Sequence, residues 1–421
     1  MIARCLYSLL SWLLTPLLLF HLWWRGRRQP AYRANIAERF GFYGARPTRP
    51  VIWLHAVSVG ETRAAAPLLQ ALAERYPDCR ILLTQMTPTG RETAGQLFGD
   101  SVDLAYLPYD QPDAVKRFLR HYQPRLGVIM ETELWPNLIH AAADAAIPLY
   151  LVNARLSEKS LRGYQRITAL IRPALCRLAG IAAASEADAD RLARLMGRRQ
   201  GLHVCGNLKY EIDPPTAQIA QGRQLRQQWG EKRPVWVCAS TREEEEALLL
   251  RALQTAKMPA GTLTVIVPRH PQRFDEVAAL LDRDGWRWQR RSTLAGALAA
   301  DVQILLGDSM GELYAYYAAA DLAFVGGSLV PLGSHSLIEP CALGVPVLLG
   351  PSTFNFAVAA QDALACGAAR QVDDADQLMQ QVTELLGDLP QRQAMGGAGR
   401  VLIGHHRGAL ARVLALLAPR R

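Results

Sequence analysis

The sequence has 421 residues, 50% of them hydrophobic and 7% aromatic, with 47 Lys and Arg against 38 Asp and Glu, a net charge of +9. This length and composition exclude a disordered, collagen-like or low-complexity chain and indicate two or three domains with ample core. The basic charge suits nucleic acid, an anionic membrane or an anionic substrate, and does not choose among them.

The seven cysteines are scattered and form no CxxC pair. An odd number of cysteines, several of them in apolar strand-like runs, favours reduced, buried thiols in a cytosolic environment over a disulfide framework. The nine histidines are equally dispersed and show no HxxxH or HExxH spacing. We therefore expect no metal site built by the protein.

The N-terminus is the one long apolar stretch, residues 2–24. The part from Leu6 to Trp24 has about the length of a membrane-spanning helix. Arg4, Pro16 and His21 instead favour a shallow or monotopic anchor, and a buried core helix is a third interpretation. WWRGRR follows the apolar residues, so a cleaved signal peptide is not indicated.

The residues after this stretch indicate an orientation. The pair Trp23–Trp24 is typical of a membrane interface, and Arg25, Arg27 and Arg28 fit the excess of cations found on the cytoplasmic side. We therefore expect a membrane-anchor helix with the body of the protein at the cytoplasmic side of the membrane.

Beyond residue 50, short β-rich runs alternate with helical stretches. The first half holds seven strand candidates, at 51–57, 80–85, 101–107, 126–131, 147–153, 180–185 and 201–207. The alternation pauses at two prolines within 209–218 and resumes with five nearly continuous apolar runs, at 234–240, 262–270, 302–307, 320–328 and 345–350. Such patterns predict two doubly wound α/β halves with buried parallel sheets, and a ligand-binding cleft between the halves.

Polar residues follow several of these strands. Ser58-Val59-Gly60 turns after the first strand, and Glu61 begins the next helix, where the helix dipole and free N–H groups favour an ionised carboxylate. An anionic Glu at the carboxyl end of a strand is well placed to accept a proton from a hydroxyl group. The alternative is a Glu that only caps the helix.

Two further segments of the first half follow the same logic. Glu131 and Glu133 come after an apolar strand and precede a helix, either as helix-start charges or as acceptors of substrate hydrogen bonds. Lys209 ends a strand near the junction of the halves. Because only five of the 47 cations are lysines, a Lys there suggests a site that needs a compact point charge, although a solvated hinge lysine is the alternative.

The second half contains three candidate anion-binding segments. Arg269 and His270 end a strand and are fit to hold a phosphate or carboxylate. The turn at Met310, Gly311 and Glu312 precedes a helix and offers free N–H groups to a base or phosphate. Gly326-Gly327 lets a loop approach a ligand closely, and Ser336, Leu337, Ile338 and Glu339 open the helix that follows, where Glu339 resembles the ribose-binding glutamate of nucleotide-sugar transferases. The chain contains no P-loop, dinucleotide GxGxxG or GxSxG elbow.

In combination, these segments resemble the bacterial 3-deoxy-D-manno-octulosonic acid (Kdo) transferases. The motifs that carry the resemblance are collinear over most of the chain: SVGE (58–61), MTPTG (86–90), LPYD (107–110), METELWPN (130–137), NARLS (153–157), GNLKY (206–210), VPRHP (267–271), GDSMGEL (307–313), FVGGSL (324–329), IEP (338–340) and GPSTFNF (350–356). The resemblance implies a GT-B glycosyltransferase that moves Kdo from CMP-Kdo to a lipid A precursor with inversion, at the cytoplasmic face of the inner membrane.

The resemblance also implies roles for particular residues. Glu61 would be the general base, and Glu131 and Lys209 would assist at the transition state. CMP would contact Arg269, His270, the segment Met310 to Glu312 and the segment Ser336 to Glu339. No metal, other cofactor or nucleic acid is expected; the implied partners are CMP-Kdo, the lipid A precursor and the phospholipid surface.

Two segments depart from the family pattern. Arg242 stands where the family commonly has His, and Glu244 where glycine is usual. The segment 333–336 reads GSHS where GGHN is typical, so Ser336 replaces an Asn.

We therefore expect three parts: a membrane anchor over 1–28, a Rossmann-like acceptor-binding domain over 29–212, and a Rossmann-like CMP-sugar-binding domain over 213–421 whose last helix can pack back on the N-terminal domain. Two rival interpretations are another GT-B sugar-nucleotide transferase, such as a heptosyltransferase, and a non-catalytic membrane-tethered scaffold that binds lipid.

Overall fold

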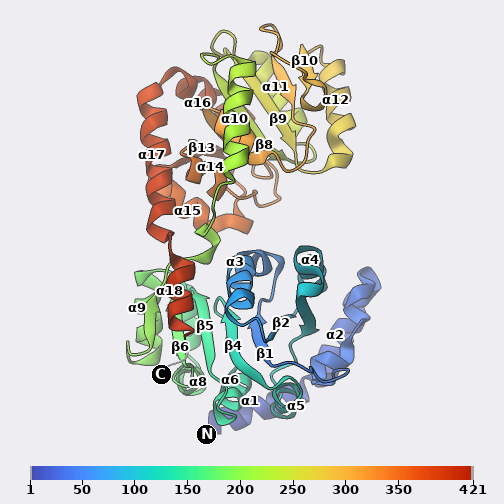
Figure 1. The fold of residues 1–421 in the computed structure, drawn as a ribbon, viewed down its shortest axis with the longest axis vertical. Helices are drawn as coiled ribbons and strands as arrows, with labels where there is room; N and C mark the ends of the chain where they lie inside the picture. Colours follow the sequence, from blue (N-terminus) through green and yellow to red (C-terminus); the bar gives the residue numbers. More distant parts are fainter. Residues whose placement is uncertain (1, 419–421) are drawn as a thin grey trace. The chain divides into compact units, whose positions relative to one another are not determined.

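The computed structural model describes residues 2–418. Residue 1 and residues 419–421, at the ends of the predicted anchor and the predicted last domain, lie outside it, as does the side chain of Arg28. Contacts divide the chain into two compact units: one contains the described parts of Met1–Glu211 and His406–Arg421, and the other contains Ile212–His405 (Figure 1).

The first unit is built on a parallel seven-stranded sheet with the order β3-β2-β1-β4-β5-β6-β7. Its strands are β1 (Val51–His55), β2 (Arg80–Gln85), β3 (Val102–Tyr106), β4 (Pro124–Met130), β5 (Leu149–Ala154), β6 (Gly180–Ala183) and β7 (Leu202–Val204). All seven coincide with predicted strands. The chain winds outward from β1 to β3 and then returns to place β4 beside β1, so the β1–β4 pair is the topological switch point where such sheets bind ligands.

Helices cover both faces of this sheet (Figure 1). One face carries α5 (Pro112–Tyr122), α6 (Pro136–Asp144), α7 (Glu158–Gln165), α8 (Thr168–Leu175) and α9 (Glu186–Met196). The other carries α3 (Val59–Arg75), α4 (Pro88–Phe98) and, from the far end of the chain, α18 (Ala409–Leu416). Each face buries its own apolar cluster, which includes Trp53 and Phe118 on the first face and Leu68 and Val413 on the second.

The second unit repeats this plan with the sheet order β10-β11-β9-β8-β12-β13-β14. Its strands are β8 (Val235–Thr241), β9 (Leu263–Pro268), β10 (Trp288–Arg290), β11 (Ile304–Leu306), β12 (Leu322–Val325), β13 (Val347–Leu349) and β14 (Ala369–Gln371). The prediction had five of these strands. It missed β10 and β14 because each is a three-residue edge strand without an apolar run.

Helices α10 (Thr216–Trp229) and α13 (Leu313–Ala319) pack on one face of the second sheet. The opposite face buries residues of α11 (Glu245–Thr255), α12 (Phe274–Arg283), α16 (Ala375–Gly387) and α17 (Leu389–His406). Two short helices, α14 (Ile338–Leu343) and α15 (Ala357–Ala365), follow β12 and β13. The predicted class of two doubly wound α/β domains is confirmed.

The N-terminal apolar stretch forms two helices, α1 (Ile2–Leu13) and α2 (Thr15–Arg28), so the expectation of one helix is wrong. The break comes just before Pro16, because a proline has no N–H to donate and its ring clashes with the carbonyl four residues earlier. Among the described helices none is by itself long and apolar enough to cross a bilayer; α1 and α2 meet that test only together, as a pair bent by 46°.

Helix α1 directs its polar side chains toward the first unit. The Ser8 hydroxyl donates to Asn137 Oδ1 at 3.1 Å, and the Tyr7 hydroxyl is hydrogen-bonded to the buried carboxylate of Asp110. Most of the exposed side chains of α1, α2 and the residue between them are instead large and apolar, apart from His21, Arg25 and Arg27 of α2: Ile2, Leu6, Leu9, Leu10, Trp12, Leu13, Leu14, Leu17, Leu19, Phe20, Trp23 and Trp24. This is the reverse of a soluble amphipathic helix, which buries its apolar face.

Candidate active site

Glu61 lies in the first turn of α3, directly after β1. The sequence Ser58-Val59-Gly60-Glu61 folds as a variant of the capping box, in which Ser58 Oγ accepts from Glu61 N–H and in turn donates to Glu61 Oε1 at 3.0 Å. The other carboxylate oxygen accepts from Val57 N–H at 2.8 Å. Glu61 therefore caps its helix, as the alternative interpretation held, and the same contacts fix its carboxylate at the switch point.

The environment of Glu61 makes its carboxylate more basic than a solvated one. Only 8% of the residue is exposed, and this burial together with the neighbouring charge of Glu131 raises the pKa of Glu61 to about 7. The hydrogen bonds from Val57 and Ser58 lower the pKa and offset part of this rise. The expectation of an ionised Glu61 considered only the helix dipole, whereas a pKa of about 7 leaves the carboxylate ionised in about half of the molecules at neutral pH. A pKa near 7 is the value that suits a general base at neutral pH.

Glu131 follows β4, the neighbour of β1, and forms an ion pair with Lys209. Its Oε1 lies 2.7 Å from Lys209 Nζ, and both side chains are a little over a quarter exposed. The backbone of Glu131 has φ of 55°, a left-handed conformation that costs a non-glycine residue about 1–2 kcal/mol. The structure thus brings Glu61, Glu131 and Lys209 together at one edge of the first sheet.

Two asparagines position Lys209. Lys209 lies in the short 3-10 helix Leu208–Tyr210, where Asn153 Oδ1 accepts from Leu208 N–H and Asn207 Oδ1 accepts from Lys209 N–H, both at 3.0 Å. Asn153 is buried and also left-handed, with φ of 57°. Both asparagines belong to motifs named above but had no predicted role; the signal was an amide side chain at the end of a predicted strand.

In the second unit, cationic side chains gather after β8 and β9. The pKa of His270 is lowered by burial and by the charges of Arg242, Arg269 and Arg273, which places these four residues in one electrostatic neighbourhood. Arg242 Nε is buried and has no hydrogen-bond partner among the described residues. Arg242, the departure from the family's His, therefore adds positive charge beside the predicted anion ligands Arg269 and His270.

A buried carboxylate organises the glycine loop after β12. Glu245, in the first turn of α11, accepts from the N–H groups of Gly327 at 2.7 Å, Leu329 at 3.0 Å and Ser328 at 3.2 Å, and also from that of Arg242 at 3.1 Å. Glu245 therefore ties the segment at Arg242, after β8, to the glycine loop after β12. These two strands are adjacent at the switch point of this sheet.

The predicted turn at Met310, Gly311 and Glu312 precedes α13. Met310 is exposed, and Gly311 has φ of 79°, so this tight turn needs glycine. The Glu312 carboxylate accepts from Ser309 and Gln221 and pairs with Arg291 at 3.1 Å. Its side chain is therefore engaged within the unit, which leaves the backbone of the turn as the part able to meet a ligand.

The segment from Ser336 to Glu339 leads into α14, with Leu337 and Ile338 buried. Ser336 Oγ accepts from Ile338 N–H at 3.3 Å. Glu339 lies in the first turn, as predicted, and its Oε2 is buried without a hydrogen-bond partner in the described part of the chain. A buried acceptor without a partner is what a ribose-binding carboxylate requires before its ligand arrives.

The described residues contain no group of three or more His, Cys, Asp or Glu side chains arranged to hold a metal ion. The arrangement in the first unit suits proton abstraction beside a positive charge. The arrangement in the second suits binding of an anionic ligand that carries hydroxyl groups.

Comparisons with known proteins agree with these features. A family model described as 3-deoxy-D-manno-octulosonic-acid transferase (kdotransferase) matches residues 34–212. The 3-deoxy-D-manno-octulosonic acid transferase of Bordetella pertussis is 42% identical over 99% of this chain and 99% of its own, and that of Haemophilus influenzae is 40% identical over 99% and 98%.

Among solved structures, UDP-GlcNAc 2-epimerase from Neisseria meningitidis bound to UDP-GlcNAc is 16% identical over 87% of this chain and 99% of that one, with a TM-score of 0.55. This likeness shows the GT-B-like fold.

Proposed function

The chain belongs to the 3-deoxy-D-manno-octulosonic acid transferase family, and on that premise we propose that it moves Kdo from CMP-Kdo to a lipid A precursor with inversion, Glu61 acting as the general base. The observation that carries the mechanism is the cluster of Glu61, Glu131 and Lys209 at the switch point of the first sheet.

The reaction needs a base because a sugar hydroxyl is a weak nucleophile. The acceptor oxygen attacks the anomeric carbon of Kdo from the face opposite the phosphate, and its proton passes to the Glu61 carboxylate. The bond from that carbon to the phosphate oxygen breaks, and the electron pair leaves with CMP. Attack opposite the leaving group inverts the anomeric centre, and the pKa of about 7 lets Glu61 take the proton near neutral pH.

Lys209 supplies positive charge beside the reacting groups. The Kdo carboxylate and the phosphate that leaves are both anionic, and a fixed ammonium group stabilises negative charge without reorganising. Glu131 holds Lys209 Nζ at 2.7 Å and raises the pKa of Glu61. Glu131 therefore acts through its two neighbours as a positioning residue.

The second unit is proposed to bind the donor. Arg242 and Arg269 supply positive charge for the phosphate and the Kdo carboxylate, and His270 and the backbone of the turn at Met310 and Gly311 are further hydrogen-bond donors. Glu339 Oε2, buried and unpartnered among the residues described, would accept from the ribose hydroxyls. Ser336 lies two residues from the start of α14 and would contact the nucleotide there.

The N-terminal helices are proposed to hold the protein at the cytoplasmic side of the inner membrane. Most of their exposed side chains are apolar, whereas polar side chains of α1 contact the rest of the first unit. This pattern supports an anchor that lies in the membrane interface. The acceptor is a lipid, so an anchor of this kind brings the enzyme to the surface where its substrate resides.

Glu61→Gln tests the proposed base, because it removes the charge and keeps the shape of the side chain. We expect Kdo transfer from CMP-Kdo to a tetra-acylated lipid A precursor to fall by roughly 10²–10⁴-fold. Glu74→Gln, on the exposed end of the same helix, is the matched control and should leave the rate unchanged. Transfer at the wild-type rate by Glu61→Gln would refute Glu61 as the base.

A further inference from the structure

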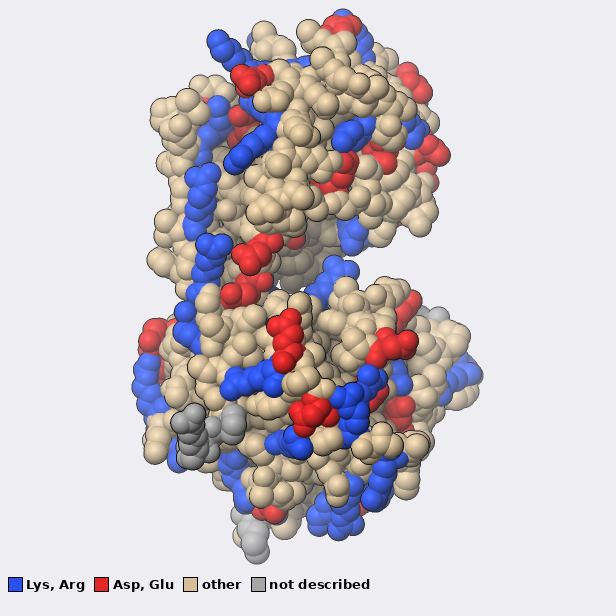
Figure 2. Space-filling view, in the orientation of Figure 1, with Lys and Arg blue, Asp and Glu red and all other residues tan. Residues whose placement is uncertain are grey.

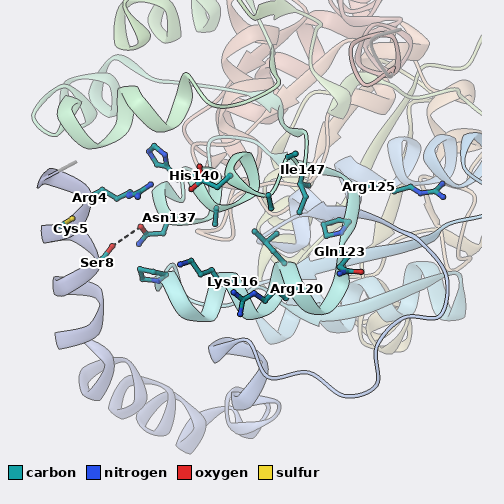
Figure 3. A pocket seen from close by; sticks show the side chains of 17 residues that line it. Arg4, Cys5, Ser8, Lys116, Arg120, Gln123, Arg125, Asn137, His140 and Ile147 are labelled. Carbon is teal, nitrogen blue, oxygen red and sulfur yellow. Dashed lines mark hydrogen bonds between the residues drawn. The ribbon is translucent and has the colours of Figure 1, made fainter.

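A basic cavity of about 960 Å³ lies in the first unit between α1, α5 and α6 (Figure 3). Arg4 reaches it from α1, Lys116 and Arg120 reach it from α5, and Arg125 lies beside it at the start of β4. In the space-filling view, Lys and Arg side chains gather on the lower edge of this unit, over the region where Figure 1 places α1 and α5 (Figure 2).

Most of the positive charge in this cavity is unpaired. Arg125 pairs with Asp78 at 2.8 Å, and Asp144, the one acidic residue in the lining, pairs with Arg177 at 2.5 Å. Arg4, Lys116 and Arg120 have no carboxylate or hydrogen-bond partner among residues 2–418. Three cations that line one cavity without ion-pair partners give it a positive potential, which suits an anion.

The cavity lies away from the proposed catalytic residues. It runs from the first turns of α5 and α6 to Gln123 and Arg125 at the amino end of β4, and none of Glu61, Glu131 and Lys209 lines it. The acceptor hydroxyl that Glu61 activates must lie at the carboxyl edge of the sheet. A ligand in this cavity is therefore a second ligand.

The wall that α1 contributes indicates where this second ligand comes from. Arg4 and Ser8 line the cavity, while Leu6, Leu9 and Leu13 of the same helix are exposed. A helix that lies in a membrane interface through these leucines would set the cavity at the depth of the lipid head groups. Basic pockets beside membrane helices are sites for anionic head groups.

We propose that this cavity binds the phosphate of an anionic membrane lipid's head group. The lipid phosphate would lie among Arg4, Lys116 and Arg120, and its acyl chains would lie along the exposed leucines of α1. The attraction between the lipid phosphate and these cations would then add to the burial of the apolar side chains of α1 and α2 in the membrane. The inference rests on the proposed membrane placement, so its test includes a measurement of that placement alone.

The experiment compares the full-length Lys116→Gln/Arg120→Gln variant with the wild type. Arg251→Gln/Lys257→Gln is the matched control, because it removes one exposed Lys and one exposed Arg from the second unit. Binding is measured by co-sedimentation with vesicles of phosphatidylcholine alone and of phosphatidylcholine with 30% phosphatidylglycerol. Circular dichroism and Kdo transfer to a detergent-solubilised acceptor establish that each variant is folded.

We expect the pocket variant to bind phosphatidylglycerol vesicles roughly 20–30-fold more weakly, at about fivefold per cation removed. The control should lose less than about twofold, and binding to pure phosphatidylcholine should be unchanged. Equal losses in both variants, or no loss in either, would overturn the proposal. Failure of all three proteins to bind either vesicle would instead refute the membrane placement.

The rate of Cys5 alkylation in the wild-type protein distinguishes binding of a lipid phosphate from binding of free inorganic phosphate. Cys5 lines the cavity and is exposed, and Cys366, exposed in the second unit, is the internal control. We expect phosphatidylglycerol vesicles to slow alkylation of Cys5 more than phosphatidylcholine vesicles do, and millimolar inorganic phosphate to have little effect. Protection by inorganic phosphate that vesicles do not match would assign the site to a soluble anion and overturn the lipid proposal.

Discussion

The ammonium group of Lys209 lies 2.7 Å from the carboxylate of Glu131, although 78 positions separate the two residues. The pair stands beside Glu61, whose pKa the charge of Glu131 raises. The carboxylates of Glu61, Glu131 and Glu133 therefore act on one another's charge at the edge of the sheet where the acceptor is proposed to react, and one of them pairs with Lys209. Each charge in this cluster has an effect that a single substitution can measure.

Lys209→Met removes the cation and keeps an unbranched side chain. We expect kcat for Kdo transfer to fall by roughly 10²–10³-fold, because the phosphate that leaves loses a fixed positive charge. Lys159→Met, an exposed lysine of α7, should retain the wild-type rate. If Lys209→Met kept more than half of kcat in steady-state assays, the lysine would have no role in the chemical step.

Glu131→Gln should shift the pH dependence of the reaction. Activity requires ionised Glu61, so kcat/KM should rise with pH through a midpoint near 7 in the wild type. Removing the negative charge of Glu131 lowers the pKa of Glu61, so the midpoint should move to lower pH. Glu133→Gln should give a smaller shift in the same direction, since Glu133 contributes less to that pKa. An upward or absent shift in Glu131→Gln would contradict this electrostatic account.

Glu61 should also make the stability of the first unit depend on pH. Its folded pKa of about 7 lies above the value of 4.5 for a solvated glutamate, so the folded state binds the extra proton. The contribution of Glu61 to the free energy of unfolding is therefore greatest below about pH 4.5. It is lost as the pH rises through 7, a decrease on the order of 3 kcal/mol.

Urea unfolding at pH 5 and pH 8.5 measures this effect. Glu61→Gln does not titrate, so we expect the difference in unfolding free energy between the two pH values to shrink by on the order of 2–3 kcal/mol relative to wild type. Glu74→Gln should preserve the wild-type difference. An unchanged difference in Glu61→Gln would show that Glu61 is ionised throughout this range.

The sequence predicted long buried strands and the residues that follow them, because apolar runs and strand-end polar residues are local patterns. Glu61 after β1 and Glu131 after β4 could be recognised in this way. The sequence patterns did not predict β10 and β14, because these are edge strands of three residues that form only by pairing with the neighbouring strand. Whether strands are adjacent is a tertiary property, and it decides which strand-end residues meet.

Burial was the second property that local patterns did not supply. The helix dipole alone predicted an ionised Glu61, whereas the packing around α3 raises its pKa to about 7. Glu245 is a similar case, because it was one acid in the run STREEEE and gave no signal. In the structure it is fully buried and accepts hydrogen bonds from four backbone N–H groups.

Glu245→Ala should loosen the glycine loop of the second unit. The substitution leaves the buried N–H groups of Gly327, Ser328 and Leu329 without their acceptor, which we expect to cost about 3 kcal/mol of unfolding free energy. We also expect KM for CMP-Kdo to rise about tenfold. Glu243→Ala, an exposed neighbour, should leave the unfolding free energy unchanged. Unfolding curves for the two variants that superimpose would show that Glu245 does not hold the loop.

Glu244 offers the opposite case, a substitution that should stabilise the protein. Its φ is 70°, in the left-handed region that costs a side chain about 1–2 kcal/mol and that glycine adopts freely, and this backbone requirement explains why glycine is expected there. Glu244→Gly should therefore raise the unfolding free energy by about 1 kcal/mol and Tm by roughly 2–4 °C. Glu243→Gly, whose backbone is not left-handed, should instead lower Tm, because glycine gains entropy on unfolding without relieving strain. Differential scanning calorimetry of the two variants tests the difference in sign, and equal shifts would contradict the strain at Glu244.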